Sequence, residues 1–236
     1  MSEQHDLAFI LPAKNEERFI AKVLTSLHDA FPAAYVCVVV NGSSDKTISL
    51  CRKTLAKLKQ GKGAFCVVEL TEEGKGNAIR EGLMQCRARN YILLDADGQH
   101  DPGESQKLLE KARSSGAGMV IGSRYLNAAK NSKNARFRAN RVFNRIFKWL
   151  FASSLTDALS GFRLLTGDFV RQLQLESRQF EIEVELFLEA RRLGETIVEV
   201  PVQETRMAAA NKLNLLKDGW KIFIFTLKKR LKHAGR

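Results

Sequence analysis

The stretch Tyr91-Ile92-Leu93-Leu94-Asp95-Ala96-Asp97-Gly98-Gln99-His100-Asp101-Pro102 decides the fold of this chain. An apolar run typical of a buried strand ends in two carboxylates, Asp95 and Asp97, and Gly98 then breaks the regular structure. In a parallel α/β sheet, ligands bind just outside the carboxyl ends of the strands. Two carboxylates at that edge can share one hard cation, but an Asp-Gly sequence is also a common turn. The pattern alone leaves both interpretations open.

Other apolar runs indicate that this strand belongs to a larger sheet. Strands are predicted over residues 7–11, 35–40, 65–70, 91–95, 119–122 and 197–200, with helices over 16–27, after 45, and over 76–87. Unbroken apolar strands that alternate with helices are typical of parallel strands covered on both faces. We therefore predict an α/β fold with a mostly parallel, Rossmann-like sheet flanked by helices.

Polar loops follow four of the predicted strands. They span residues 12–16, 41–45, 95–99 and 122–125. Because the carboxyl ends of parallel strands lie at one edge of a sheet, we expect these loops to converge on a ligand site. Gly74-Lys75-Gly76 opens the third helix, where backbone N–H groups favour an anion, but it lacks the spacing of a nucleotide-binding P-loop.

The net charge of +12 is concentrated in two amphipathic segments. Residues 127–151 contain seven basic residues and no acid, and residues 212–236 contain eight basic residues with Asp218 as the sole acid. We expect the apolar residues of 136–151 on one broad face of a helix. Basic helices with Trp and Phe are typical of a membrane interface, where anionic lipids attract Lys and Arg. Alternatively, the aromatic residues pack on the main domain and the cations face solvent.

The rest of the sequence points to the cytoplasm. The polar N-terminus is no signal peptide, and no apolar stretch approaches the ~20 residues of a transmembrane helix. The four cysteines form no C-x-x-C pair, as in a reduced protein. No nucleic-acid-binding motif accompanies the basic segments, so we predict no nucleic-acid partner. We expect a cytoplasmic protein associated peripherally with the inner face of the membrane.

Seven motifs occur along the chain in a recognisable order. They are residues 12–16 (PAKNE), 41–47 (NGSSDKT), 74–79 (GKGNAI), 95–102 (DADGQHDP), 122–125 (GSRY), 157–163 (DALSGFR), and 199–202 (EVPV) followed by Arg206 and 211–213. As a set they resemble family 2 glycosyltransferases of the GT-A fold, most closely the polyprenyl-phosphate (dolichyl-phosphate) mannose or glucose synthases. The resemblance implies a GT-A domain over residues 1–210, including the basic segment 128–151, and a basic amphipathic helix over 211–236.

The resemblance also implies a reaction and its residues. A hexose, mannose or glucose, would pass with inversion from a GDP- or UDP-hexose to a polyprenyl phosphate at the membrane surface. Asp97 and Gln99 would hold Mg²⁺ or Mn²⁺. The nucleotide-sugar would be bound by Pro12, Asn15, Glu16, Asn41, Ser43, Lys75, Asp95, Ala96, Asp97, Arg206 and Lys212. The acceptor phosphate would be bound by Arg124, Arg136, Arg138, Ser160 and Arg163. The residues acting in the transfer itself would be Asp95, Asp97, Arg124 and Arg206.

The identity of the acceptor has alternatives. A phosphate monoester, with a second pKa near ~6, needs no strong general base. A sugar hydroxyl or another soluble acceptor would need one, for which Glu183 or Asp157 is a candidate. A third possibility is a non-catalytic nucleotide-sugar or nucleic-acid binder that kept the fold. The chain departs from the family pattern at Lys14, Val40 and Asn41, which would contact the base, so the resemblance leaves the nucleotide open.

Overall fold

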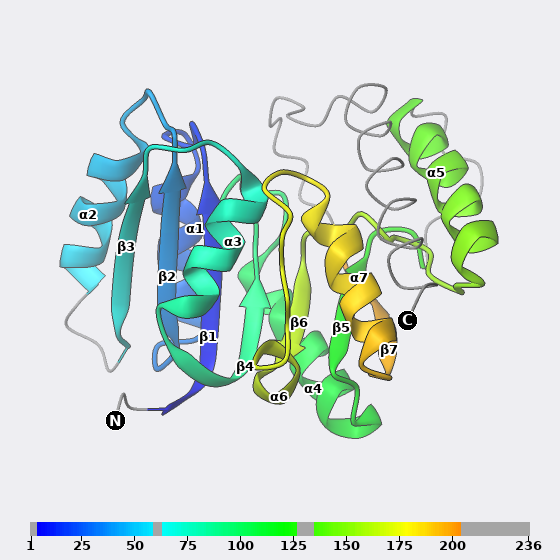
Figure 1. The fold of residues 1–236 in the computed structure, drawn as a ribbon. Helices are drawn as coiled ribbons and strands as arrows, with labels where there is room; N and C mark the ends of the chain where they lie inside the picture. Colours follow the sequence, from blue (N-terminus) through cyan, green and yellow to red (C-terminus); the bar gives the residue numbers. More distant parts are fainter. Residues whose placement is uncertain (1–3, 59–62, 127–134, 204–236) are drawn as a thin grey trace.

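The computed structural model describes residues 4–58, 63–126 and 135–203. Within them, a seven-stranded sheet has the order β3-β2-β1-β4-β6-β5-β7 (Figure 1). The strands are β1 (Gln4–Ala13), β2 (Tyr35–Asn41), β3 (Phe65–Leu70), β4 (Arg87–Leu93), β5 (Met119–Ser123), β6 (Arg163–Thr166) and β7 (Ile197–Pro201). The helices are α1 (Ile20–Ala30), α2 (Thr47–Leu58), α3 (Lys75–Met84), α4 (Ser105–Ser115), α5 (Ala135–Phe151), α6 (Gly167–Val170) and α7 (Ile182–Arg192), with a 3-10 turn η1 (Pro102–Glu104).

The prediction of a mostly parallel α/β sheet is confirmed, but one strand was missed. β6 lies antiparallel between β4 and β5, pairing Leu164 with both Ile92 and Val120. No strand was predicted here because this strand is short and begins with a charged residue, Arg163. Several boundaries also differ. The largest differences are that α1 begins at Ile20 instead of residue 16, and that β4 begins at Arg87 instead of residue 91.

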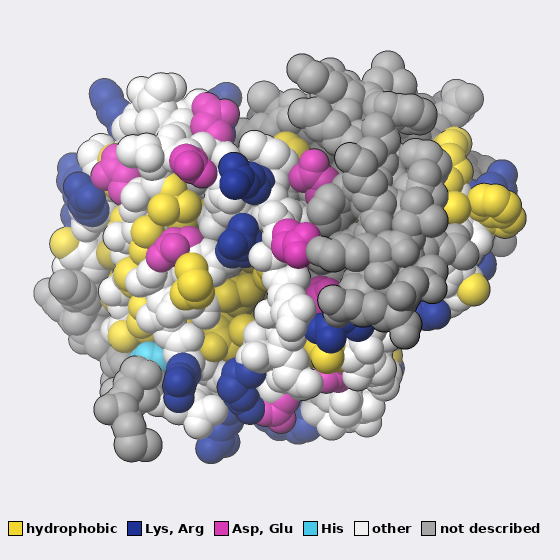
Figure 2. Space-filling model, viewed as in Figure 1, with side chains coloured by type: hydrophobic (Ala, Val, Ile, Leu, Met, Phe, Trp, Pro, Cys, Tyr) yellow, Lys and Arg dark blue, Asp and Glu magenta, His cyan; other side chains and the backbone are white. Residues whose placement is uncertain are grey.

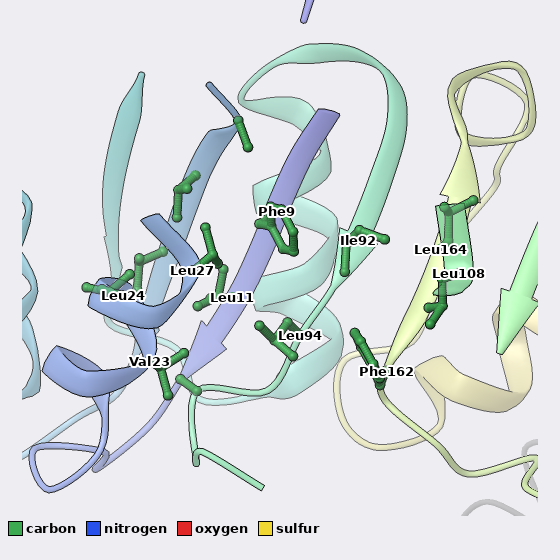
Figure 3. Close-up of a cluster of buried hydrophobic side chains, with 14 of the residues drawn as sticks. Phe9, Leu11, Val23, Leu24, Leu27, Ile92, Leu94, Leu108, Phe162 and Leu164 are labelled. Carbon is green, nitrogen blue, oxygen red and sulfur yellow. The ribbon is translucent and has the colours of Figure 1, made fainter. Parts of the chain in front are cut away.

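Alternating side chains of the central strands form two cores, one on each face of the sheet. In β1, Phe9 and Leu11 belong to one core, whereas Ala8 and Ile10 belong to the other. Figure 3 shows the first core, in which side chains of α1 and α4 meet β1, β4 and β6. The second core receives α3, α6 and α7, together with Phe147 of α5. Burial on both faces explains why the central strands are continuous apolar runs.

All four cysteines lie within the described residues. All four cysteines are free thiols, and Cys37 and Cys51 are buried in the cores. Burial raises the pKa of the Cys86 thiol to about 11, so this thiol stays protonated at neutral pH. Among the described helices, none has the length and apolar character needed to cross a membrane.

Candidate active site

Two loops at the carboxyl edge of the sheet are joined by hydrogen bonds. The N–H of Asn15 donates to Ser43 Oγ at 3.0 Å, and the N–H of Ser44 donates to Asn15 Oδ1 at 2.9 Å. The N–H of Glu16 donates to Thr47 Oγ1 at 2.8 Å. Asn15 has a φ of 52°, in the left-handed region that Asn tolerates better than most residues. The predicted convergence of these loops is confirmed, and their polar side chains hold each other in place.

Asp95 and Asp97 lie directly after β4 at the same edge. The backbone N–H of Gln99 donates to Asp97 Oδ1 at 3.0 Å, so the segment is also an Asx-turn. Ala96 is buried between the two carboxylates, while Asp95, Asp97 and Gln99 keep partial exposure. The turn and the ligand site were alternatives in the sequence; the structure contains the turn and leaves both carboxylates at the surface where a ligand can reach them.

The donor set at this turn fits a hard divalent cation. Asp97 contributes a carboxylate and Gln99 an amide oxygen, both oxygen ligands that Mg²⁺ prefers. No group of three or more His, Cys, Asp or Glu side chains that could hold a metal occurs in the described residues. Mg²⁺ is usually bound by one or two carboxylates together with substrate phosphates instead of a complete protein cage. The chemistry therefore fits a metal whose remaining ligands come from a diphosphate.

Lys75 binds two carboxylates from distant parts of the chain. Its Nζ lies 2.7 Å from Asp95 Oδ1 and 2.8 Å from Glu183 Oε1, and it donates to Asp95 Oδ2 at 2.9 Å. Burial alone would lower the pKa of Lys75, but the two carboxylates raise it overall. Burial alone would raise the pKa of Asp95, but the attraction of Lys75 lowers it overall. The lysine predicted to bind the nucleotide-sugar thus directs its charge at Asp95 and Glu183.

The start of α3 is covered by backbone carbonyls. A Cβ on Gly74 would lie 2.1 Å from the Arg178 oxygen, and one on Gly76 would lie 2.4 Å from the Ser177 oxygen. The N–H of Asn77 donates to the same Arg178 oxygen at 3.2 Å. One N–H group of the first turn of α3 therefore donates to a backbone carbonyl, and the anion expected at this helix terminus stays a prediction.

The loop before β6 lies against the Lys75–Asp95 pair. A Cβ on Gly161 would be 2.5 Å from Lys75 Nζ and 2.6 Å from Asp95 Oδ2, so a larger residue here would displace the ion pair. Phe162 follows it and stacks on the buried ring of His100 at 5.0 Å between centroids. The motif 157–163 therefore contacts the carboxylate that ends β4.

Arg124 forms a bidentate ion pair with Asp157. Its Nε lies 2.7 Å from Asp157 Oδ2 and its NH2 donates to Oδ1 at 2.8 Å. Asp157 is buried, and its own N–H donates to Glu199 Oε1 at 2.9 Å. Burial raises the pKa of Glu199 despite the hydrogen bonds that it accepts. We expected the guanidinium of Arg124 to face the acceptor phosphate. In this structure it binds the carboxylate of Asp157.

The prediction that Arg163 and Ser160 bind the acceptor phosphate is wrong. Arg163 is fully buried, and it donates to the carbonyl oxygens of Ser160, Ala158 and Glu183, each at 2.7 Å. Burial lowers the pKa of its guanidinium to about 10. Ser160 is also buried and donates to the Gly122 oxygen at 2.7 Å. Both residues support the loop from within.

The remaining predicted residues divide into two groups. Pro12 is half-buried at the end of β1 and Asn41 is buried at the end of β2, both at the carboxyl edge. Arg206, Lys212 and the predicted helix over 211–236 lie outside the described residues. Arg136 and Arg138 belong to α5, but their side chains lie outside the described part.

Several residues that shape the site were harder to find in the sequence, because they are acids within an apolar helix. α7 buries three acids, Glu183, Glu185 and Glu189, among apolar side chains. Buried carboxylates need partners, so acids inside an apolar helix indicate ion pairs or backbone donors elsewhere. Glu185 accepts from the N–H groups of Glu176 and Ser177, which shapes the loop over the start of α3. Only their partners, set by tertiary structure, could not be read from the sequence.

Comparisons with known proteins confirm the predicted family. The family described as "Glycosyl transferase family 2" matches residues 8–172. The chain is 32% identical over 204 residues to an undecaprenyl-phosphate mannosyltransferase of Micrococcus luteus, covering 82% of this chain and 81% of the relative. It is 31% identical over 222 residues to a dolichyl-phosphate beta-glucosyltransferase of Drosophila melanogaster, covering 86% and 68%.

A solved structure shares the same architecture. Glucosyl-3-phosphoglycerate synthase from Mycobacterium tuberculosis, crystallised with Mn²⁺, uridine-diphosphate and phosphoglyceric acid, matches with a TM-score of 0.72 and 19% identity. The match covers 96% of this chain and 78% of that one, so the fold is the GT-A fold of glycosyltransferases. The ordered motifs, the carboxyl-edge site and these matches lead to one conclusion: the chain belongs to glycosyl transferase family 2 and is a hexosyltransferase.

Proposed function

We propose that this enzyme transfers a hexose from a nucleotide-diphospho-sugar to a polyprenyl phosphate at a membrane surface. The relatives named for undecaprenyl phosphate and dolichyl phosphate support this class of acceptor. The observation that carries the proposal is that both candidate general bases are already paired with cations. Asp157 is held by Arg124, and Glu183 is held by Lys75. With both carboxylates neutralised by cations, an acceptor that brings its own negative charge fits the site better than a neutral hydroxyl.

The proposed reaction is a direct displacement. An oxygen of the acceptor phosphate attacks the anomeric carbon, the bond from that carbon to the diphosphate breaks, and the nucleoside diphosphate leaves with inversion. A divalent cation bound at Asp97 and Gln99 would neutralise charge on the departing diphosphate. Asp95, fixed by Lys75, orients the donor beside the Gly161 loop. Arg206 and Lys212 complete the donor site in this proposal.

A label-transfer assay tests the proposal directly. Purified protein is incubated with Mg²⁺ or Mn²⁺, a polyprenyl phosphate and radiolabelled GDP- or UDP-hexoses, and label entering the organic phase is counted. We expect transfer from one donor, lost with a chelator, and none to the matched polyprenol that lacks the phosphate. Label transferred to the polyprenol, or only to soluble acceptors, would show that the acceptor is wrongly assigned.

The pH dependence of the transfer rate should reflect ionisation of the acceptor phosphate instead of a protein side chain. The rate is expected to rise as the phosphate becomes a dianion near pH ~6 and then to level off. The Lys75–Asp95 pair keeps its charges across this range, because the pKa of Asp95 is lowered and that of Lys75 is raised. Steady-state rates from pH 5 to 9 test this. A phosphorothioate acceptor, which is more acidic, should move the rise to lower pH; an unmoved profile would point to a protein base.

A further inference from the structure

α5 carries an exposed apolar stripe on its outer side. Val142 is 60% exposed, Ile146 is 45% exposed and Trp149 is 82% exposed. Their spacing of four and three residues places them on one face of the helix. We call these three residues the α5 outer stripe. Figure 2 shows hydrophobic side chains at this edge of the molecule, with Lys and Arg beside them.

The opposite face of α5 is fixed to the protein. Phe147 is buried, and its ring lies 4.8 Å from that of Phe187 in α7; Phe151 lies 5.6 Å from the same ring. Phe143 stacks on Phe147 at 6.0 Å. The sequence predicts the apolar residues of this helix on one broad face, and only part of that face packs on the protein. The phenylalanines at 143, 147 and 151 pack inward, which leaves the α5 outer stripe turned away from the core.

The charge around the stripe has one sign. Arg145 and Lys148 are exposed on the same helix, and residues 127–151 contain no acid. An exposed tryptophan among lysine and arginine suits the headgroup region of a bilayer. There its apolar ring can contact lipid while its N–H contacts polar groups. Each basic residue adds attraction to an anionic leaflet. The combination is complementary to an anionic lipid surface.

We infer that the α5 outer stripe is the surface by which this enzyme docks on an anionic lipid bilayer. The inference rests on the proposed function, because the polyprenyl phosphate lies in such a bilayer. It adds the particular face and the orientation that docking imposes. Val142, Ile146 and Trp149 enter the interface, and Arg145 and Lys148 meet the phosphates of the lipid headgroups.

Docking through this face would also orient the acceptor side of the site. Asn144, on the same helix, donates from Nδ2 to the Thr156 oxygen at 2.6 Å and accepts at Oδ1 from the N–H of Ala158 at 3.1 Å. These two contacts bracket Asp157, the residue that binds Arg124. Two hydrogen bonds therefore link the docking helix to the segment that contains the partner of Arg124.

Vesicle binding of the full chain tests the inference. Trp220→Phe leaves Trp149 as the single tryptophan, since the sequence contains two. With vesicles of mixed phosphatidylglycerol and phosphatidylcholine, we expect its emission to shift to the blue and to be shielded from acrylamide. In a sedimentation assay, Ile146→Ser with Trp149→Ser should weaken binding about 30-fold, since two large apolar side chains lose their burial. Met84→Ser, which alters an apolar residue 72% exposed at the end of α3, should leave binding unchanged.

The outcomes separate docking from catalysis. Trp149 emission that stays unshifted while the protein sediments, or a double variant that binds as well as the Met84 control, would overturn the inference. A shift that appears without vesicles as protein concentration rises would assign the stripe to a second copy of the chain and overturn it as well. Transfer to a short, water-soluble prenyl phosphate measures the proposed function without a membrane. We expect the double variant to keep that activity.

Discussion

Replacing Asp97 with Ala is expected to reduce hexose transfer by at least about 1,000-fold while leaving the protein folded. The reason is the position of this carboxylate at the turn after β4, where it and Gln99 form the oxygen donor set that fits a divalent cation. A metal on a departing diphosphate stabilises the transition state by several kcal/mol, and each 1.36 kcal/mol is tenfold in rate. The lost hydrogen bond from Gln99 costs about 1 kcal/mol of unfolding free energy.

A neighbouring residue supplies the matched control. Asp101 also follows β4, and its Oδ1 accepts from the N–H of Gly103 at 2.9 Å, the same two-residue pattern as Asp97 with Gln99. Asp101→Ala removes an equivalent local hydrogen bond without touching the proposed metal ligands. Steady-state transfer and Mn²⁺-dependent binding of the nucleoside diphosphate are measured on both variants. Transfer retained by Asp97→Ala, or lost equally in the control, would refute the metal assignment.

The sequence predicted the part of this site that depends on single strands. Each apolar run ends where its polar residues begin, so the placement of Asn15, Asn41 and Asp95 at one edge follows from strand direction alone. That edge is present in the structure, and hydrogen bonds join the loop of Asn15 to that of Ser43. Local pattern is sufficient here because a parallel sheet brings all its carboxyl ends together.

The groups that the basic side chains of the site bind could not be predicted in the same way. The family resemblance assigned Lys75 to the nucleotide-sugar and Arg124 to the acceptor phosphate, which suits the planar fork of arginine. In the structure each binds a carboxylate far along the chain, Glu183 and Asp157 respectively. Those contacts depend on β6, whose antiparallel insertion brings the 157–163 loop to β4. Missing that strand therefore led to the errors about Ser160 and Arg163.

Replacing Lys75 with Met is expected to lower the unfolding free energy by about 3–5 kcal/mol. The ammonium side chain is 13% exposed and Glu183 is 5% exposed, so the substitution leaves a buried carboxylate without its cation. Asp95, at 31% exposed, regains some solvation from water and contributes less to the loss. Urea unfolding at pH 7 measures the effect.

The choice of pH follows from the direction of the two pKa shifts. The pKa of Asp95 is lowered, so its stabilising contribution is complete above the ordinary value near ~3.9 and is lost as pH falls through the folded-state pKa. The pKa of Lys75 is raised, so its contribution is complete below about 10.4 and is lost only as pH rises through the folded-state pKa. At pH 7 both contributions are present in full, and the single variant shows the whole loss.

A double variant distinguishes a lost ion pair from a general packing defect. Glu183 Oε2 is buried and has no hydrogen-bond partner among the described residues, so Glu183→Met also removes an unsatisfied oxygen. Lys75→Met combined with Glu183→Met should therefore be at least about 2 kcal/mol more stable than Lys75→Met alone, because Glu183 no longer leaves a buried charge without its cation. If the two losses simply add, the pair contributes little, and the stability of this edge comes from the packing of Gly161 and the α3 glycines against their neighbouring loops instead.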